Sequence, residues 1–171
     1  TNTTVTTLED TQYVFSAANF GFTDPNDSPV NALTAVKITT IPGAGSLTLS
    51  GSAVTAGQTV SVANINSGLL KFDAVANAKG TGYTTFTFQV QDDGGTANGG
   101  IDLDASANTL TIDVTSVNDA PAGTNTTVTT LEDTQYVFSA ANFGFTDPND
   151  SPANALTAVK ITTIPGAGSL T

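Results

Sequence analysis

Tyr83-Thr-Thr-Phe-Thr-Phe-Gln-Val-Gln-Asp92 is the stretch that decides the fold of this 171-residue chain. Within it Phe86, Phe88 and Val90 alternate with polar residues, which is the period of a strand with one buried and one wet face. Asp92-Asp-Gly-Gly95 follows directly and has the composition of a turn. The stretch therefore predicts a strand that lies on a hydrophobic core.

Six further stretches on either side are short and rich in β-branched or alternating apolar residues. They are Thr3–Thr7, Gln12–Ser16, Leu33–Ile41, Ser46–Ser50, Leu69–Asp73 and Thr109–Thr115. Between them, Gly51–Ser61 indicates a small hairpin around Ala56-Gly57, and Val62–Gly68 has room for one helical turn. Seven such strands without a long amphipathic helix predict an all-β fold, an antiparallel Greek-key β-sandwich of the Ig-like kind.

The chain contains an internal repeat with a period of 124 − 1 = 123 residues. Residues 124–171 restate residues 1–48 with one change, Ala153 in place of Val30. A period this long corresponds to a whole domain and not to one turn of a solenoid. Such near-identity is typical of a uniform array, which a stalk needs and an enzyme does not.

The repeat sets the expected domain organisation. We predict a β-sandwich repeat over residues 1–116, an inter-domain linker over 117–123, and the first strands of the next repeat over 124–171. The second copy lacks the later strands and with them half of its core partners. We therefore expect it not to fold well alone, and its open edges to seek strands from another chain.

Acidic residues dominate the charge of the chain. Fifteen Asp and Glu stand against four basic residues, all of them Lys, and the net charge is −11. Such a chain is expected to repel nucleic acid and anionic membranes and to attract cations. No apolar run is long enough to span a membrane. His, Cys and Arg are absent, so the usual general bases and oxyanion donors are missing and we expect no enzyme.

The predicted topology gathers these acids at the ends of the sandwich, because consecutive antiparallel strands alternate in direction. One junction is expected to hold Glu9, Asp10, Asn118, Asp119, Asp147, Asn149 and Asp150. The junction one repeat earlier is expected to hold Asp24, Asn26, Asp27, Asp92 and Asp93. Closely packed carboxylates repel unless neutralised, and Ca²⁺ favours oxygen-only sites, whereas Zn²⁺ favours His and Cys. The alternative is that the Asp-Pro-Asn-Asp loop is an Asx-turn that needs no metal.

Four motifs, in order along the chain, resemble a known family. They are Leu8-Glu-Asp-Thr11, Thr23-Asp-Pro-Asn-Asp-Ser-Pro-Val-Asn-Ala32, Phe88-Gln-Val-Gln-Asp-Asp-Gly94 and Val117-Asn-Asp-Ala-Pro121. They are similar to the domain start, the B–C loop, the end of strand F and the inter-domain linker of cadherin-like repeats. The whole unit resembles the cadherin-like tandem repeats of giant bacterial surface adhesins, often of the RTX type.

The resemblance implies Ca²⁺ at domain junctions, neighbouring repeats of the same chain as partners, and an extracellular or bacterial cell-surface location. The ligands that it implies at one junction are Glu9, Asn118, Asp119, Asp147, Asn149 and Asn154, and one junction earlier Asp24, Asn26, Asn31 and Asp92. Ser116 and Ala120 depart from the linker of animal cadherins. We therefore expect fewer ions per junction than in that family.

The function implied by the resemblance is structural. The chain would be part of an extender that is stiffened by Ca²⁺ and spaces an adhesive tip from the cell. The alternative is a module that binds a ligand or other copies of itself. In that case a neighbouring chain would complete the second copy by strand complementation and build head-to-tail filaments.

Overall fold

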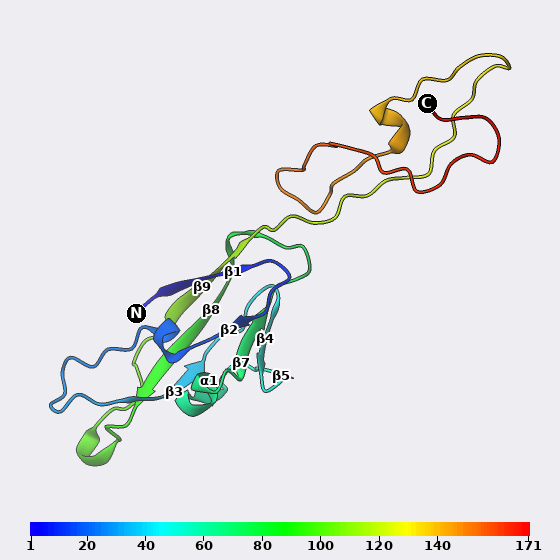
Figure 1. The fold of residues 1–171 in the computed structure, drawn as a ribbon. Coiled ribbons are helices and arrows are strands. Elements are labelled where there is room, and N and C mark those ends of the chain that lie inside the picture. The colour runs from blue at the N-terminus through cyan, green and yellow to red at the C-terminus, as the bar shows by residue number, and fades with distance from the viewer. The chain divides into compact units, whose positions relative to one another are not determined.

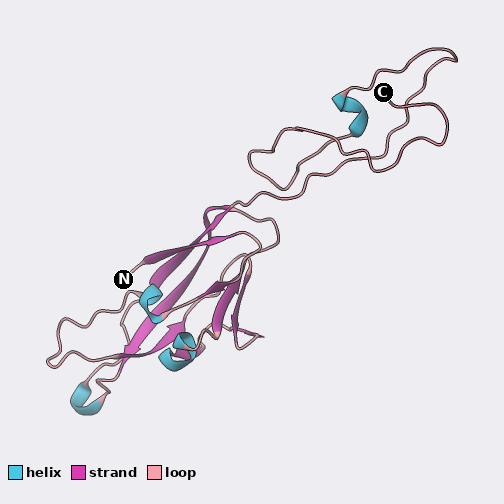
Figure 2. Cartoon of the chain, in the orientation of Figure 1, coloured by secondary structure: helices cyan, strands magenta, loops and turns pink.

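A computed structural model describes all residues from 1 to 171. The chain divides into two compact units, Thr1–Val117 and Asn118–Thr171. The first unit is mostly β and is built from two sheets (Figure 1, Figure 2). No helix in the structure has the length and apolar character needed to cross a lipid bilayer.

The larger sheet of the first unit has five strands. In spatial order they are β1 (Thr3–Leu8), β9 (Asn108–Thr115), β8 (Gly80–Asp92), β3 (Leu33–Ile38) and β6 (Thr59–Ser61). The smaller sheet has four, in the order β2 (Tyr13–Val14), β7 (Leu70–Asp73), β4 (Ser46–Leu49) and β5 (Ser52–Ala53). Three short helices complete the unit: η1 (Ala17–Phe20), α1 (Val62–Asn66) and η2 (Ala97–Gly99).

The core lies between the two sheets and is filled by the residues that the alternation predicts. Phe86 and Phe88 on β8 are fully buried. They meet aromatic rings from the segment around β2 and η1: the ring centroids of Phe86 and Phe15 lie 5.8 Å apart, and those of Phe88 and Phe20 lie 5.1 Å apart. Both contacts are edge-to-face, the arrangement that aromatic pairs prefer. The predicted β-sandwich is thus confirmed as two sheets around one core.

Two features of the sheets differ from the prediction. First, β1 pairs with β9 in parallel, with Thr3 opposite Leu110 and Leu8 opposite Thr115, so the sandwich is not wholly antiparallel. These strands come from opposite ends of the unit, and no tight turn requires them to be antiparallel. Second, the predicted hairpin over residues 51–61 is wrong: β5 pairs with β4, whereas β6 pairs with β3 in the other sheet.

The helical turn predicted after β6 is present as α1, and its start is set by a side-chain cap. The Oγ atom of Ser61 accepts a hydrogen bond from the backbone N–H of Asn64 at 3.2 Å. A Ser in this position satisfies one of the amide donors that a helix leaves unpaired at its first turn. Ile65 on α1 is 1% exposed and joins the core.

The second unit contains no strand, although residues 124–171 match a segment that forms four strands in the first unit. It keeps one 3-10 helix, η3 (Ala140–Phe143), which matches η1, and one isolated bridge between Ala122 and Thr146. Local structure is therefore retained where it depends on nearby residues. In the first unit the four matching strands pair only with β5 to β9, and residues 118–171 contain no counterpart of those strands.

Candidate metal sites

Glu9 lies on the core-facing side of the first strand. Side chains alternate between the faces of a strand, and on this one Val5, Thr7 and Glu9 are 6%, 8% and 1% exposed. The backbone N–H of Glu9 donates to the carbonyl of Thr115 at 2.9 Å, which extends the β1–β9 pairing by one residue. The alternation thus places a carboxylate, and not an apolar side chain, at the end of the core face.

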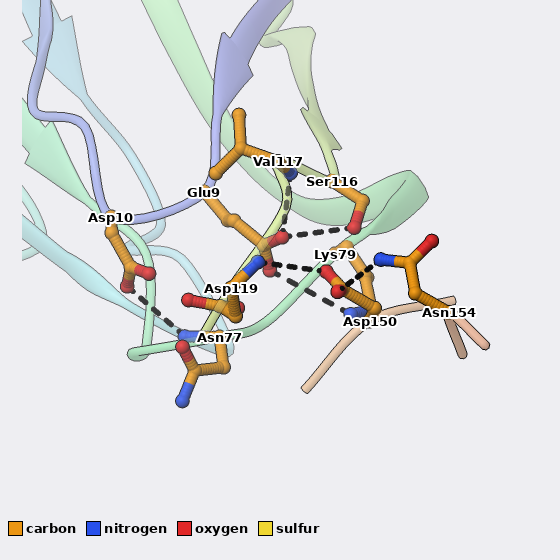
Figure 3. A network of polar contacts seen from close by, with 9 residues as sticks. All are labelled: Glu9, Asp10, Asn77, Lys79, Ser116, Val117, Asp119, Asp150 and Asn154. Atoms are coloured by element: carbon orange, nitrogen blue, oxygen red, sulfur yellow. Dashed lines mark hydrogen bonds and ion pairs between the residues drawn. The ribbon is translucent and has the colours of Figure 1, made fainter. Parts of the chain in front are cut away.

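The Glu9 carboxylate is held by the last residues of the first unit (Figure 3). Its Oε1 atom accepts hydrogen bonds from Ser116 Oγ at 2.9 Å and from the backbone N–H of Val117 at 2.7 Å. Its Oε2 atom is buried and accepts no hydrogen bond, and the ammonium nitrogen of Lys79 lies 3.9 Å away. We call Glu9, Lys79, Ser116 and Val117 the Glu9 cluster.

The next residue points the other way and fixes the neighbouring loop. Asp10 has a left-handed backbone with φ of 55°, a conformation that Asp tolerates better than most residues. Its carboxylate accepts a hydrogen bond from the backbone N–H of Asn77 at 3.1 Å (Figure 3). This bond ties the turn after β1 to the β7–β8 loop, which also carries Lys79.

In the second unit a buried aspartate organises the loop after η3. Asp147 is 7% exposed, and its Oδ2 atom accepts a hydrogen bond from the backbone N–H of Asn154 at 2.6 Å. Its Oδ1 atom is buried and accepts no hydrogen bond. An unpaired buried carboxylate oxygen is costly for a protein to maintain. The position is therefore suited to a ligand that supplies positive charge.

The linker is bound to this loop by several hydrogen bonds. Asp150 accepts one from the backbone N–H of Asp119 at 3.0 Å and one from Asn154 Nδ2 at 2.7 Å (Figure 3). Asn154 Nδ2 also donates to Asn118 Oδ1 at 2.7 Å. Farther along, Ala122 and Thr146 exchange two backbone bonds of 2.8 Å each. We call Asn118, Asp119, Asp147, Asp150 and Asn154 the Asp147 cluster.

A cavity adjoins the Asp147 cluster. Its volume is about 400 Å³, and Asn118, Asp119, Asp147 and Asn154 line it together with apolar residues such as Phe145. Four side chains that carry oxygen atoms thus face one space. Oxygen atoms from carboxylates and amides are the ligands that Ca²⁺ prefers.

The first unit carries the same loop one repeat earlier. Asp24 accepts a hydrogen bond from the backbone N–H of Asn31 at 2.8 Å, and Asp27 accepts one from Asn31 Nδ2 at 2.9 Å. The loop after β8 joins it, because Asp93 accepts from the backbone N–H of Ala32 at 2.7 Å and Asp92 from Gly94 at 2.9 Å. We call Asp24, Asp27, Asn31, Asp92 and Asp93 the Asp24 cluster.

The structure thus gathers most of the predicted ligands into three clusters, two in the first unit and one in the second. Asn26 is exposed and Asn149 half-buried, each within its own acidic loop. The meeting of Glu9 with Asp119 and Asp147 at one junction stays a prediction. Reasoning from the sequence missed Lys79 as the partner of Glu9. The scarcity of cations in the chain was the one signal that could have drawn attention to it.

The residues fit Ca²⁺ in their chemistry, although they do not form a complete cage. No three Asp, Glu, His or Cys side chains form a group that could hold a metal ion by themselves. Apart from Lys79, every polar side chain in the three clusters carries an oxygen atom that could bind a metal ion. Two buried carboxylate oxygens, one in Glu9 and one in Asp147, accept no hydrogen bond. A bound Ca²⁺ would take its remaining ligands from amide oxygens, backbone carbonyls or water.

Comparison with known proteins identifies no relative. No family model matches the chain, and neither a curated protein nor a solved structure is significantly similar to it. The function is therefore inferred from the residues and their geometry.

Proposed function

We propose that the chain is part of an extender of a secreted bacterial adhesin, in which Ca²⁺ binds where one 123-residue repeat joins the next. In this proposal each complete repeat is a Greek-key sandwich of the Ig-like, cadherin-like kind. The observation that carries the proposal is Asp147, a 7% exposed carboxylate with an oxygen that accepts no hydrogen bond, in the loop that binds the linker.

The Asp147 cluster supports a divalent cation more than a purely structural turn. A structural turn would satisfy both carboxylate oxygens with N–H donors, as Asp150 does with Asp119 and Asn154. Asp147 instead keeps Oδ1 without a donor beside a cavity lined by further oxygen-bearing side chains. A bound Ca²⁺ ion would compensate the negative charge of the Asp147 carboxylate, which burial separates from water.

The Glu9 cluster supports Ca²⁺ near the linker by its position in the chain. Glu9 binds the backbone N–H of Val117, and the two residues that follow, Asn118 and Asp119, belong to the Asp147 cluster. Carboxylates thus accept hydrogen bonds from two residues at the start of the linker, Val117 and Asp119. Ca²⁺ bound to these carboxylates would restrict the linker, because several fixed ligands remove the backbone freedom of a short segment.

The proposed role as an extender has further support in the composition and in the repeat. A net charge of −11 without His, Cys or Arg suits a cation-binding structural protein. Forty-seven of 48 residues agree between the copies, with Val30 against Ala153 as the only difference, which suits a uniform array. The proposed partners are neighbouring repeats, and the proposed location is the bacterial cell surface.

Solution scattering tests this proposal on the intact chain. The chain is measured in Ca²⁺ and in EGTA at equal ionic strength. Ca²⁺ is expected to change the maximum dimension and to narrow the distribution of conformations, because the linker becomes restricted. Identical scattering curves in Ca²⁺ and EGTA would refute the role of Ca²⁺ in stiffening the junction.

Self-association is a second candidate function, which one observation favours. Apolar residues of the second unit are exposed, among them Val137 at 81%, Phe138 at 45% and Ile161 at 54%. Exposed apolar surface promotes association with a partner that can cover it. Light scattering over a range of protein concentrations distinguishes the candidates: a constant monomer mass supports the extender, and growth with concentration supports assembly.

A further inference from the structure

β1 is the longest of the four edge strands in the first unit. β6 has three residues, and β2 and β5 have two each, whereas β1 has six. It pairs with β9 alone, so its other side is open (Figure 1). A very short edge strand offers few unpaired backbone groups, which limits its pairing with another chain. β1 is therefore the edge of the sandwich where a further strand has most to bind.

Alternate residues of β1 present their backbone to the open side. The backbone N–H of Glu9 donates to the carbonyl of Thr115 on β9. Because successive residues of a strand direct their N–H and C=O groups to opposite sides, the odd-numbered residues of β1 face β9. Thr4, Thr6 and Leu8 face outward, and their side chains are exposed. We call these three residues the β1 edge.

β1 lacks the features by which proteins keep edge strands from pairing. Its sequence, Thr3-Thr-Val-Thr-Thr-Leu8, contains no charged residue and no Pro, and its register with β9 is continuous, without a bulge. Charged side chains, Pro and bulges are the usual protection of an exposed edge. All of its residues except Leu8 are β-branched, a composition that favours paired strands. In a chain of net charge −11, β1 is an uncharged segment where two copies of the chain repel each other least.

We propose that the β1 edge binds the β1 edge of a second copy of the chain, with the two strands antiparallel about a two-fold axis at Thr6. Thr6 then pairs with Thr6 of the other copy, and Thr4 pairs with Leu8 in both directions. Each of these pairs can exchange two backbone hydrogen bonds, and Thr side chains opposite each other in a sheet are favourable. A two-fold contact of this kind closes at a dimer.

Charge favours the antiparallel arrangement over a parallel one. In the antiparallel register Asp10, four residues after Thr6, comes opposite Asn2, four residues before it. A parallel arrangement in register would instead bring the two Asp10 side chains together, and like charges that face each other are destabilising. Asp113, which is opposite Thr6 on β9, would lie three strand spacings from its counterpart. That separation is about 14 Å, at which salt screens the repulsion.

The pairing differs from strand complementation, because it uses the first unit alone and leaves every strand of the sandwich in place. β1 and β9 are parallel and run from the start of the unit toward the linker, so the two paired chains run in opposite directions. One pair of six-residue strands is a small contact and gives a weak dimer. In a uniform array each repeat would add the same edge, and many weak pairs would bind tightly together. This strengthening rests on the proposed function, whereas the pairing itself does not.

Cysteine crosslinking in the full chain tests the pairing and its register, because the chain has no Cys of its own. Thr6→Cys places a thiol opposite itself across the two-fold axis, at a Cα separation of about 5.5 Å that a disulfide can bridge. Thr4→Cys and Leu8→Cys place thiols opposite each other only when the two variants are mixed. Thr85→Cys is the matched control, an exposed Thr on β8 away from the edge. Diamide oxidises the thiols, and non-reducing electrophoresis measures the crosslinked dimer in Ca²⁺ and in EGTA.

Thr6→Cys should crosslink at least about ten times faster than Thr85→Cys, because pairing raises the local concentration of the thiols. The mixture of Thr4→Cys and Leu8→Cys should crosslink as well, and neither variant should do so alone. Equal rates for Thr6→Cys and Thr85→Cys would overturn the pairing, and crosslinking of Thr4→Cys by itself would overturn the antiparallel register. The yields should be equal in Ca²⁺ and in EGTA, so failure of the proposed Ca²⁺ site would leave this result unchanged.

Opposite charges at the two-fold axis give a second measure. Thr6→Lys and Thr6→Glu each bring two like charges together and should lower the dimer fraction in sedimentation equilibrium, whereas a mixture of the two variants should restore it. Because Thr6 is exposed, both variants should unfold close to the midpoint of the unmodified chain, which separates loss of pairing from loss of folding. A mixture that is no more dimeric than either variant alone would overturn the proposal.

Discussion

Asp24 and Asp147 occupy the same position in identical loops but differ in burial. Each accepts a hydrogen bond from the backbone N–H of the Asn seven residues later, at 2.8 Å and 2.6 Å. Asp24 is half-buried, whereas Asp147 is 7% exposed. In the second copy, Ala122 of the linker pairs with Thr146 beside this loop. Asp147 is thus the buried member of a pair of aspartates in matching loops.

This relationship predicts unequal effects of one substitution at two places. Asp147→Asn removes the charge from the buried site and should abolish the Ca²⁺-dependent change in solution scattering. Asp24→Asn makes the same chemical change in the half-buried copy and should leave that change in place. The unfolding midpoint of the first unit in EGTA is the control for Asp147→Asn and should stay constant, because Asp147 lies outside the sandwich. Equal effects of both substitutions would argue against a role for the burial of Asp147.

Glu9 offers a second matched pair. Glu9→Gln keeps an acceptor for Ser116 and Val117 but removes the negative charge, so the rise of the unfolding midpoint on adding Ca²⁺ should disappear. The same change at its copy, Glu132→Gln, affects an exposed side chain and should leave the rise unchanged. Thermal unfolding in Ca²⁺ and in EGTA measures both. A full Ca²⁺ response in Glu9→Gln would remove Glu9 from the proposed site.

Substitution of Lys79 should weaken the sandwich without Ca²⁺ but strengthen the binding of Ca²⁺ when the ion is present. Its ammonium nitrogen lies 3.9 Å from the buried Oε2 atom of Glu9, where it compensates charge in the absence of a metal ion. In EGTA, Lys79→Gln should destabilise the sandwich by about 1 kcal/mol. In Ca²⁺ it should strengthen binding of the ion, because a competing cation is removed, and the gain should shrink as salt is added. Lys71→Gln is a charge-matched control.

Truncation of an aromatic side chain should lower the free energy of unfolding in the first copy only. Phe15→Ala opens a cavity beside Phe86 and Phe20 and should lower the free energy of unfolding by about 3–5 kcal/mol. Phe138→Ala alters a ring that is 45% exposed and should change the free energy of unfolding by less than about 0.5 kcal/mol. Chemical denaturation measures both. A large effect of Phe138→Ala would mean that residues 124–171 take part in the sandwich of the unmodified chain.

The sequence was most informative where burial follows a local period. The alternation of Phe86, Phe88 and Val90 predicts β8 and its core face, and both are present. Ser61 marks the start of α1 through a cap that needs only neighbouring residues. The pairing of Thr59–Ser61 could not be predicted, because three residues carry no clear period. Its pairing with β3 depends on the packing of the whole sandwich.

The candidate site shows the same division. The contacts of Asp24 and Asp147 with Asn31 and Asn154 lie within short loops, and the loop composition singled these residues out. The partner of Glu9 could not be found in this way, since Lys79 lies far away in sequence and has no motif around it. The parallel pairing of β1 and β9 brings Ser116 and Val117 to Glu9. Because the sequence predicted an antiparallel sandwich, it did not predict this contact.

Calcium titration by calorimetry on the unmodified chain tests the central claim most directly. We expect heat of binding with a dissociation constant of roughly 10⁻⁶ to 10⁻³ M. We also expect an unfolding midpoint that is higher in Ca²⁺ than in EGTA. Absence of both the heat and the shift would contradict the claim, and the acidic clusters would then be turns that only keep the repeat soluble.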